Sequence, residues 1–219
     1  MNIYGKNKQK SNYNNRRCRW SHKRFHGREI KKQPLKIRIK NSIYKHKRKK
    51  AEKVIVANPH SLSETVEYAK DKYGLNEIAF TDKKYIEQKK DLKESLILQY
   101  KPELLGENKD IQKPDFWNEE TVREFWNKTE ARSKMIAQMP DNVITMNFHL
   151  YEIKIDDNSL EIEIDYEWNI FGVSYSGNKA VMKKFKKIAK DLRSYYGVTE
   201  DDIKNKTQRY SSLITELSS

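Results

Sequence analysis

The stretch that decides the fold runs from residue 144 to residue 175 and reads ITMNFHLYEIKIDDNSLEIEIDYEWNIFGVSY. Apolar and polar side chains alternate on both sides of the turn cluster Asp156-Asp157-Asn158-Ser159, and that period is typical of half-buried strands. The pattern predicts an antiparallel β-hairpin, with a third strand over residues 170 to 175. Because helical patterns flank this stretch, we expect an α+β protein whose C-terminal hairpin or three-stranded sheet is packed by helices.

Helical signals follow the predicted sheet. Apolar residues recur at helical spacing over residues 179 to 196, and Gly197 stands where a glycine commonly ends a helix. Thr199 and Asp202 have the spacing of a capping box and predict one last helix. The helix over residues 179 to 196 is rich in lysine. We expect a solvated face there, or alternatively a second nucleic-acid footprint, from Lys183, Lys184, Lys186, Lys187 and Lys190.

The middle of the chain is predicted to be mostly helical. Ser61 and Glu64 form a second capping-box pattern, and Gly74 marks the end of that helix. Short β-branched or apolar runs predict strands over residues 53 to 57 and 78 to 80, and a further helix begins after Thr81 or Asp82. Asn118 caps a helix over residues 119 to 138, with Phe116 and Trp117 packed against its start. The predicted organisation is a basic arm (1–50), a small α/β or helical region (51–105), a linker (106–116) and an α+β domain (117–219).

The N-terminal segment carries most of the positive charge. The first 53 residues contain 20 Lys and Arg but two acidic residues, a net charge of +18, whereas the other 166 contain 25 basic and 29 acidic residues, a net charge of −4. Because such a basic segment repels itself and buries little apolar surface, we expect a disordered arm that becomes ordered when it binds a polyanion. Within it, residues 35 to 39 (LKIRI) alternate apolar and basic side chains and predict a short strand.

Aromatic residues are interleaved with the cations of this arm. Lys and Arg bind phosphates, while exposed rings give bases a surface on which to stack. The alternative is a solvated polybasic tail whose rings pack on the protein's own body. The candidate nucleic-acid-binding residues are Arg16, Arg17, Arg19, Trp20, Lys23, Arg24, Phe25, Arg28, Lys47, Arg48, Lys49 and Lys50.

An acidic row is predicted on the second strand of the hairpin. Glu161, Glu163, Asp165 and Glu167 alternate with apolar residues, so all four are expected on one face. Three interpretations remain open. The row is a solvent face paired with Lys154 or with the basic arm, or a phosphate-mimicking surface that binds a partner, or a metal site for phosphodiester cleavage.

Other chemistry finds little support in the sequence. The chain has one cysteine and seven glycines, and it lacks a cysteine cluster and a glycine-rich phosphate loop. His149 is expected to face solvent, and a role as general base in RNA cleavage is the alternative. We predict no cofactor and no bound metal. No apolar run is long enough to span a membrane and no secretory leader is apparent, so we expect a cytoplasmic location in a bacterial host cell.

The N-terminus resembles a known family. Tyr4-Gly5-Lys6, the stretch Ser11-Asn12-Tyr13 with Asn15-Arg16-Arg17, and Arg24-Phe25 are similar to the arm of broad-spectrum type II-A anti-CRISPR proteins from Gram-positive phages and mobile elements. The resemblance covers about 50 residues. The order of the strands that end at Tyr175 and of the helix that follows is also similar, but this chain has an additional region over residues 54 to 115.

The resemblance implies an inhibitor of a type II RNA-guided Cas nuclease, which acts on the nuclease with its guide RNA and in some members leads to guide truncation. A basic arm that grips RNA phosphates without reading sequence suits such a target. The alternatives are a sequence-nonspecific RNA- or DNA-binding protein of a phage, plasmid or ribosome, and a metal-dependent nuclease. Nothing in the sequence requires that this chain be an enzyme.

Overall fold

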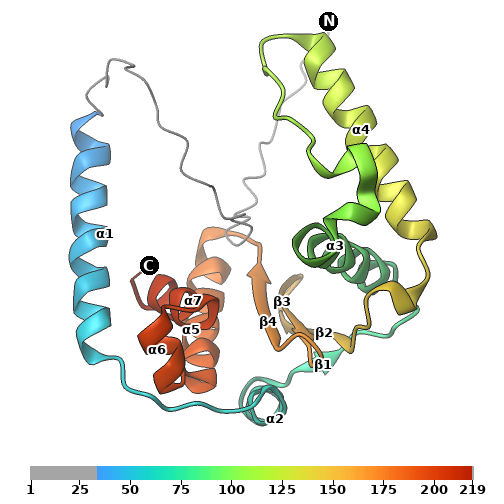
Figure 1. Ribbon diagram of the computed structural model, residues 1–219. Helices are drawn as coiled ribbons and strands as arrows, with labels where there is room; N and C mark the ends of the chain where they lie inside the picture. The colour runs from blue at the N-terminus through green and yellow to red at the C-terminus, as the bar shows by residue number, and fades with distance from the viewer. Residues whose placement is uncertain (1–33, 219) are drawn as a thin grey trace, which may run out of the picture. The chain divides into compact units, whose positions relative to one another are not determined.

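The structure is a computed structural model that describes residues 34–218 (Figure 1). In the described residues helices predominate, and a four-stranded sheet lies among them. The helices are α1 (Leu35–Val54), α2 (Leu62–Tyr73), α3 (Lys83–Tyr100), α4 (Glu119–Gln138), α5 (Lys179–Tyr196), α6 (Glu200–Asn205) and α7 (Gln208–Ser218), with 3-10 helices η1 (Pro102–Lys109) and η2 (Asp141–Val143). The strands are β1 (Asn76–Glu77), β2 (Phe148–Ile155), β3 (Asn158–Asp165) and β4 (Ile170–Tyr175).

The predicted α+β class is confirmed. The sheet is antiparallel and has the order β1-β2-β3-β4. The predicted hairpin corresponds to β2 and β3, and the predicted third strand to β4. The strand predicted over residues 78 to 80 is not formed. The short strand β1 lies just before it, where Asn76 pairs with Glu152 and Glu77 with Tyr151. At the other end of the hairpin, the amide of Tyr166 donates to the carbonyl of Asn147 at 3.1 Å.

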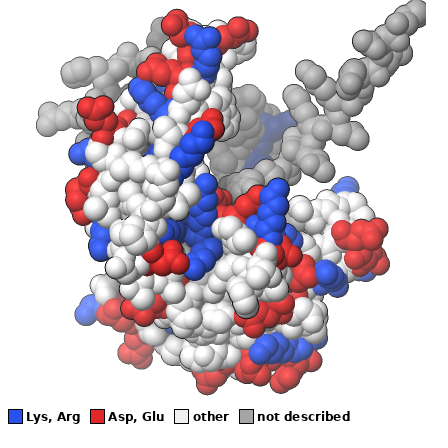
Figure 2. Space-filling model, turned by 90° about the vertical axis from the view of Figure 1, so that its right-hand side faces the viewer, with Lys and Arg blue, Asp and Glu red and all other residues white. Residues whose placement is uncertain are grey.

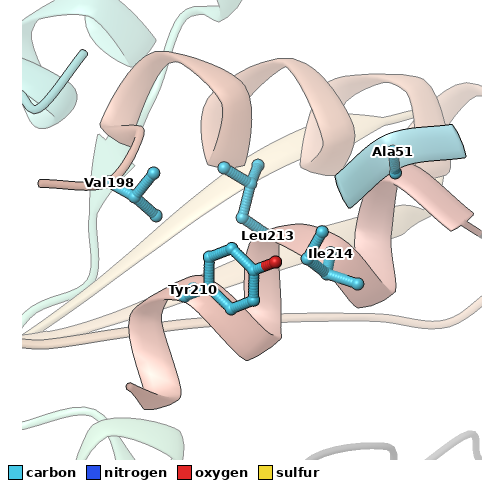
Figure 3. Packing of buried hydrophobic residues seen from close by; sticks show 5 residues of the cluster. All are labelled: Ala51, Val198, Tyr210, Leu213 and Ile214. Atoms are coloured by element: carbon cyan, nitrogen blue, oxygen red, sulfur yellow. The ribbon is translucent and has the colours of Figure 1, made fainter. Parts of the chain in front are cut away.

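The chain divides into two compact units. The first comprises the described residues up to 73, together with residues 154–160 and 174–218. One cluster of its buried residues forms where the C-terminal end of α1 meets α7, as Figure 3 shows. The buried residues of this cluster are Ala51, Val198, Tyr210, Leu213 and Ile214, with Ile55 packed against them. Helix α1 is therefore attached to this unit through its last turn.

The second unit comprises residues 74–153 and 161–173. Its cluster of buried residues consists of Leu96, Ile97, Leu105, Ile136 and Ile144. Residues on both sides of the predicted linker thus share one core. The first part of that linker belongs to η1, in which Leu105 is 1% exposed and Gly106, with φ of 52°, introduces a kink.

Local capping signals were accurate predictors of helix ends. The amide of Ser61 donates to Glu64 Oε2 at 2.7 Å, and the Glu64 amide donates to Ser61 Oγ at 3.2 Å, which is a capping box. Thr199 and Asp202 form another, and Asn118 accepts from the first amides of α4. The last predicted helix is divided into α6 and α7, because Lys206 adopts the left-handed conformation between them.

Four further predictions about local structure were wrong. Residues 35 to 39 belong to helix α1 rather than to a strand, and residues 35 to 50 are helical rather than disordered. Lys53 and Val54 complete α1, and the residues after them pair in no strand. Phe116 and Trp117 are 77% and 96% exposed, so they do not pack against the start of α4. Among residues 34 to 218, no helix combines the length and apolar character needed to cross a membrane.

Candidate nucleic-acid interface

Helix α1 carries a high density of positive charge, and most of its residues are exposed. Its 20 residues include nine Lys and Arg and a single acidic residue, Glu52. Every residue from 34 to 50 is exposed, and the first buried position is Ala51. Such a helix presents its cations to solvent along most of its length, where they can meet phosphate groups.

The structure describes only part of the nucleic-acid-binding site that the sequence predicts. Lys47, Arg48, Lys49 and Lys50 lie on the C-terminal half of α1 and are exposed. Arg48 Nε lies 3.0 Å from Oε1 of Glu52, one turn further along the helix. This hydrogen bond raises the pKa of the Arg48 guanidinium above its usual value. The predicted residues Arg16, Arg17, Arg19, Trp20, Lys23, Arg24, Phe25 and Arg28 lie outside the described residues.

The first unit holds α1 in place through apolar contacts. A 20-residue helix with so many like charges is marginal by itself, because nucleation is costly and the charges repel. Here Ala51 is 7% exposed and packs beside Leu213 and Ile214 of α7 (Figure 3). Burial of the last turn therefore compensates for the repulsion and leaves the preceding turns available to a ligand.

Helix α5 carries a second group of cations. Its apolar side, with Phe185 and Leu192 at 0% exposure, packs in the core, and the opposite side carries the lysines. As predicted, the exposed residues include Lys183, Lys184, Lys186, Lys187 and Lys190. Arg193, by contrast, lies within the protein, and burial lowers the pKa of its guanidinium to about 10.

The charges of the second unit are mixed in sign. Figure 2 shows acidic and basic side chains interspersed on the face toward which α4 lies in Figure 1. On α4, Lys128 Nζ lies 2.6 Å from Glu124, and Lys134 Nζ lies 2.7 Å from Glu130. Arg132 lies 2.9 Å from Glu94 of α3. These cations are partly neutralised, so α4 is a weaker candidate for phosphate binding than α1.

The predicted acidic row does not form one exposed face. Glu161 pairs with Lys84 of α3 at 2.8 Å, and its side chain is 19% exposed. Asp165 is 0% exposed, and its Oδ1 accepts from the Trp168 amide at 3.0 Å. The prediction failed at Asp165 because this residue ends β3 and closes the following turn, in which Glu167 lies exposed. The four carboxylates therefore do not form one continuous exposed row.

His149 is half-buried rather than freely solvated. Its Nδ1 lies 2.7 Å from Glu77 Oε1, its Nε2 lies 3.2 Å from Asn147 Oδ1, and its ring meets that of Tyr166 edge to face. The ring is thus held by Glu77 of β1, by Asn147 just before β2 and by Tyr166 just after β3. Within residues 34 to 218, no group of three or more His, Cys, Asp and Glu side chains is arranged to hold a metal ion.

Sequence reasoning missed a polar cluster between α2 and α5. Asp191 accepts hydrogen bonds from the hydroxyls of Tyr68 and Tyr73, at 2.7 and 2.8 Å, and pairs with Lys72 at 2.9 Å. Burial raises the pKa of Tyr73 to about 12, assisted by its bond to Asp191. The rings of His60, Tyr195 and Tyr68 stack in succession beside it. These polar groups satisfy one another's hydrogen-bonding capacity and join α2 to α5. We therefore assign the cluster a structural role.

Comparison with known proteins gives no further guide. No family model, curated protein or solved structure matches this chain. Among the described residues, the surface with the clearest chemical preference is the exposed basic part of α1.

Proposed function

We propose that this protein binds nucleic acid through its basic N-terminal segment, chiefly by contacts to phosphates. The observation that carries the proposal is the exposure of α1 from residue 34 to residue 50, together with nine cations against one acid in that helix. Polyanionic backbones attract such a surface, and the counterions that they release on binding supply much of the free energy.

The charge of the chain as a whole supports the same proposal. The first 53 residues hold a net charge of +18, and the remainder holds −4. The described cations of this segment lie on a helix that the first unit anchors at one end. A charged helix that is already folded loses less conformational entropy on binding than an unstructured segment.

The proposal is tested by measuring affinity against salt. The full chain is titrated into labelled 20-nucleotide RNA and DNA, and we expect log affinity to fall linearly with log salt concentration. Replacing Lys47, Arg48, Lys49 and Lys50 by glutamine should lower the slope on single strands by about 0.7 for each phosphate contact that is lost.

The matched control changes the same number of charges on another helix. Replacing Lys183, Lys184, Lys186 and Lys187 of α5 by glutamine should have a clearly smaller effect. An equal loss in the two variants would show that net charge, rather than the α1 surface, governs binding. Binding that is independent of salt would contradict the proposal altogether.

We propose inhibition of a type II RNA-guided Cas nuclease as a second, more specific function. It is favoured by the N-terminal motifs Tyr4-Gly5-Lys6, Asn15-Arg16-Arg17 and Arg24-Phe25, which lie outside the described residues. The test is a DNA-cleavage assay with purified nuclease and guide RNA, in which the protein should reduce the cut product. Guide length is followed on a gel, with and without chelator, to detect truncation. Full cleavage by several orthologous nucleases at saturating protein would refute this second proposal.

A further inference from the structure

The side chains of α1 are arranged in four stripes along the helix. One stripe faces the body of the first unit, because it contains the buried Ala51. At seven-residue spacings before it lie Tyr44 and Ile37, which occupy the same side of the helix. Ile55, which follows the helix, packs against the same core. The side of α1 that faces the protein is thereby established.

Over residues 35 to 46, the stripe on the opposite side of the helix carries no charge when His46 is neutral. Its members follow one another at spacings of four, three and four residues, namely Leu35, Ile39, Ser42 and His46. All four are exposed, with Leu35 at 68% and Ile39 at 52%. Exposed aliphatic side chains on such a basic helix suit a ligand that offers apolar contacts as well as negative charge.

Two rows of cations border this outer stripe. At about 100° of rotation per residue, one row lies about 80° to one side of it and the other about 70° to the other side. The first row is Lys36, Lys47 and Lys50, and the second is Arg38, Lys45 and Lys49. Of the other cations, Lys53 lies in line with Leu35 of the outer stripe, whereas Lys40 and Arg48 lie toward the body, where Arg48 pairs with Glu52.

We infer that α1 is a duplex-binding helix that enters the major groove of B-form DNA with its outer stripe toward the bases. The major groove is about 12 Å wide and an α-helix is about 10 to 12 Å in diameter, so the helix fits. A helix seated there has one phosphate backbone on each flank, which is where the two cation rows lie. This inference rests on the proposed nucleic-acid binding and specifies its ligand class.

The outer stripe suits the floor of the groove. Thymine displays its methyl group there, and aliphatic side chains make apolar contacts with it, while the imidazole of His46 can hydrogen-bond to base edges. A single strand lying along one side of α1 would use one cation row and leave the other unused. An A-form RNA duplex has a deep, narrow major groove that does not admit a helix.

The first experiment compares the two rows in the full chain. One variant replaces Lys36, Lys47 and Lys50 by glutamine, and the other replaces Arg38, Lys45 and Lys49 by glutamine. On a 20-base-pair DNA duplex, each variant should lower the salt slope by about 2.7, which is three phosphates at about 0.9 each. A loss confined to one row would overturn the groove placement. Glutamine preserves helix propensity, and circular dichroism confirms that each variant is folded.

The second experiment tests the orientation of the helix with one substitution at two positions. Ile39 and Ile37 are 52% and 46% exposed but lie on opposite sides of α1. We expect Ile39→Glu to weaken duplex binding at least tenfold more than Ile37→Glu, because only the former places a carboxylate against the bases. Equal effects of the two substitutions would overturn the orientation.

The third experiment varies the ligand. Binding should be at least tenfold weaker for an RNA duplex of the same sequence, and severalfold weaker for a DNA duplex in which uracil replaces thymine. Equal affinity for all polymers would overturn this inference while leaving the proposed nucleic-acid binding intact. Failure to bind any of these polymers at low salt would contradict both this inference and the proposed nucleic-acid binding. Binding to anionic phosphatidylserine vesicles but not to the duplex would assign the outer stripe to a membrane surface instead.

Discussion

Lys84 Nζ lies 2.8 Å from Oε1 of Glu161, which joins helix α3 to strand β3 within the second unit. The side chains are 39% and 19% exposed, so solvent screens the pair only in part. In a double-mutant cycle of Lys84→Met and Glu161→Gln, we expect a coupling energy of roughly 0.5 to 1 kcal/mol. The free energy of unfolding in urea, measured for the four proteins, provides this value.

A neighbouring pair on the same helix is the control for that cycle. Lys83 Nζ lies 3.8 Å from Glu87, and the side chains are 89% and 67% exposed. The corresponding cycle of Lys83→Met and Glu87→Gln should yield at most about 0.3 kcal/mol. Equal coupling in the two cycles would show that the Lys84–Glu161 contact contributes nothing beyond general surface charge.

Asp191 should be the most sensitive polar residue of the first unit. It accepts from two tyrosine hydroxyls and a lysine, so Asp191→Ala leaves three donors without their acceptor. We expect a loss of about 1 to 3 kcal/mol in the free energy of unfolding. Tyr73→Phe removes a single bond and should cost about 1 kcal/mol. If Asp191→Ala is no more destabilising than Tyr73→Phe, the other two contacts are not formed in solution.

The contribution of Asp191 should also depend on pH. Burial by itself would raise the pKa of this carboxyl, but the hydrogen bonds from Lys72, Tyr68 and Tyr73 outweigh it and lower the pKa below its usual value. A lowered pKa in the folded state stabilises the protein above the pKa of the unfolded state, and the effect is lost as pH falls through the folded value. The stability difference between wild type and Asp191→Asn should therefore shrink below about pH 4. A constant difference from pH 7 to pH 2 would contradict this assignment.

The features that the sequence predicted well are local. Ser61 with Glu64 and Thr199 with Asp202 determine helix starts through side chains three residues apart, so no tertiary information is needed. The Lys84–Glu161 pair depends on which helix covers which face of the sheet, and spacing along the chain does not determine that. The prediction of a strand over residues 35 to 39 is wrong because LKIRI alternates as a strand does, whereas these residues are the first turns of a helix that continues to Val54. Four of the predicted nucleic-acid-binding residues could be located, all on α1.

The attachment of α1 to α7 provides a prediction about folding. Ala51 is 7% exposed beside Leu213 and Ile214, so Ala51→Glu introduces both bulk and charge into that contact. We expect a loss of about 1 to 3 kcal/mol and faster tryptic cleavage within residues 36 to 50, because the released helix is only marginally stable. Lys53→Glu changes charge on the exposed side and should leave the cleavage rate of those residues little changed. Unaltered proteolysis of Ala51→Glu would show that α1 is helical without its anchor.

Two glycines that end helices should respond very differently to alanine. Gly74 and Gly197 have φ of 66° and 61°, so alanine is strained at both positions by about 1 to 2 kcal/mol. An added Cβ at Gly74 meets nothing within 4 Å, whereas at Gly197 it would lie 2.0 Å from the carbonyl oxygen of Asn58. That segment is fixed, because the Asn58 amide donates to the Val198 carbonyl at 3.1 Å. We therefore expect Gly74→Ala to cost about 1 to 2 kcal/mol and Gly197→Ala at least about twice as much, as measured by urea unfolding. Equal losses would show that residues 58 and 197 do not approach each other in solution as they do in this structure.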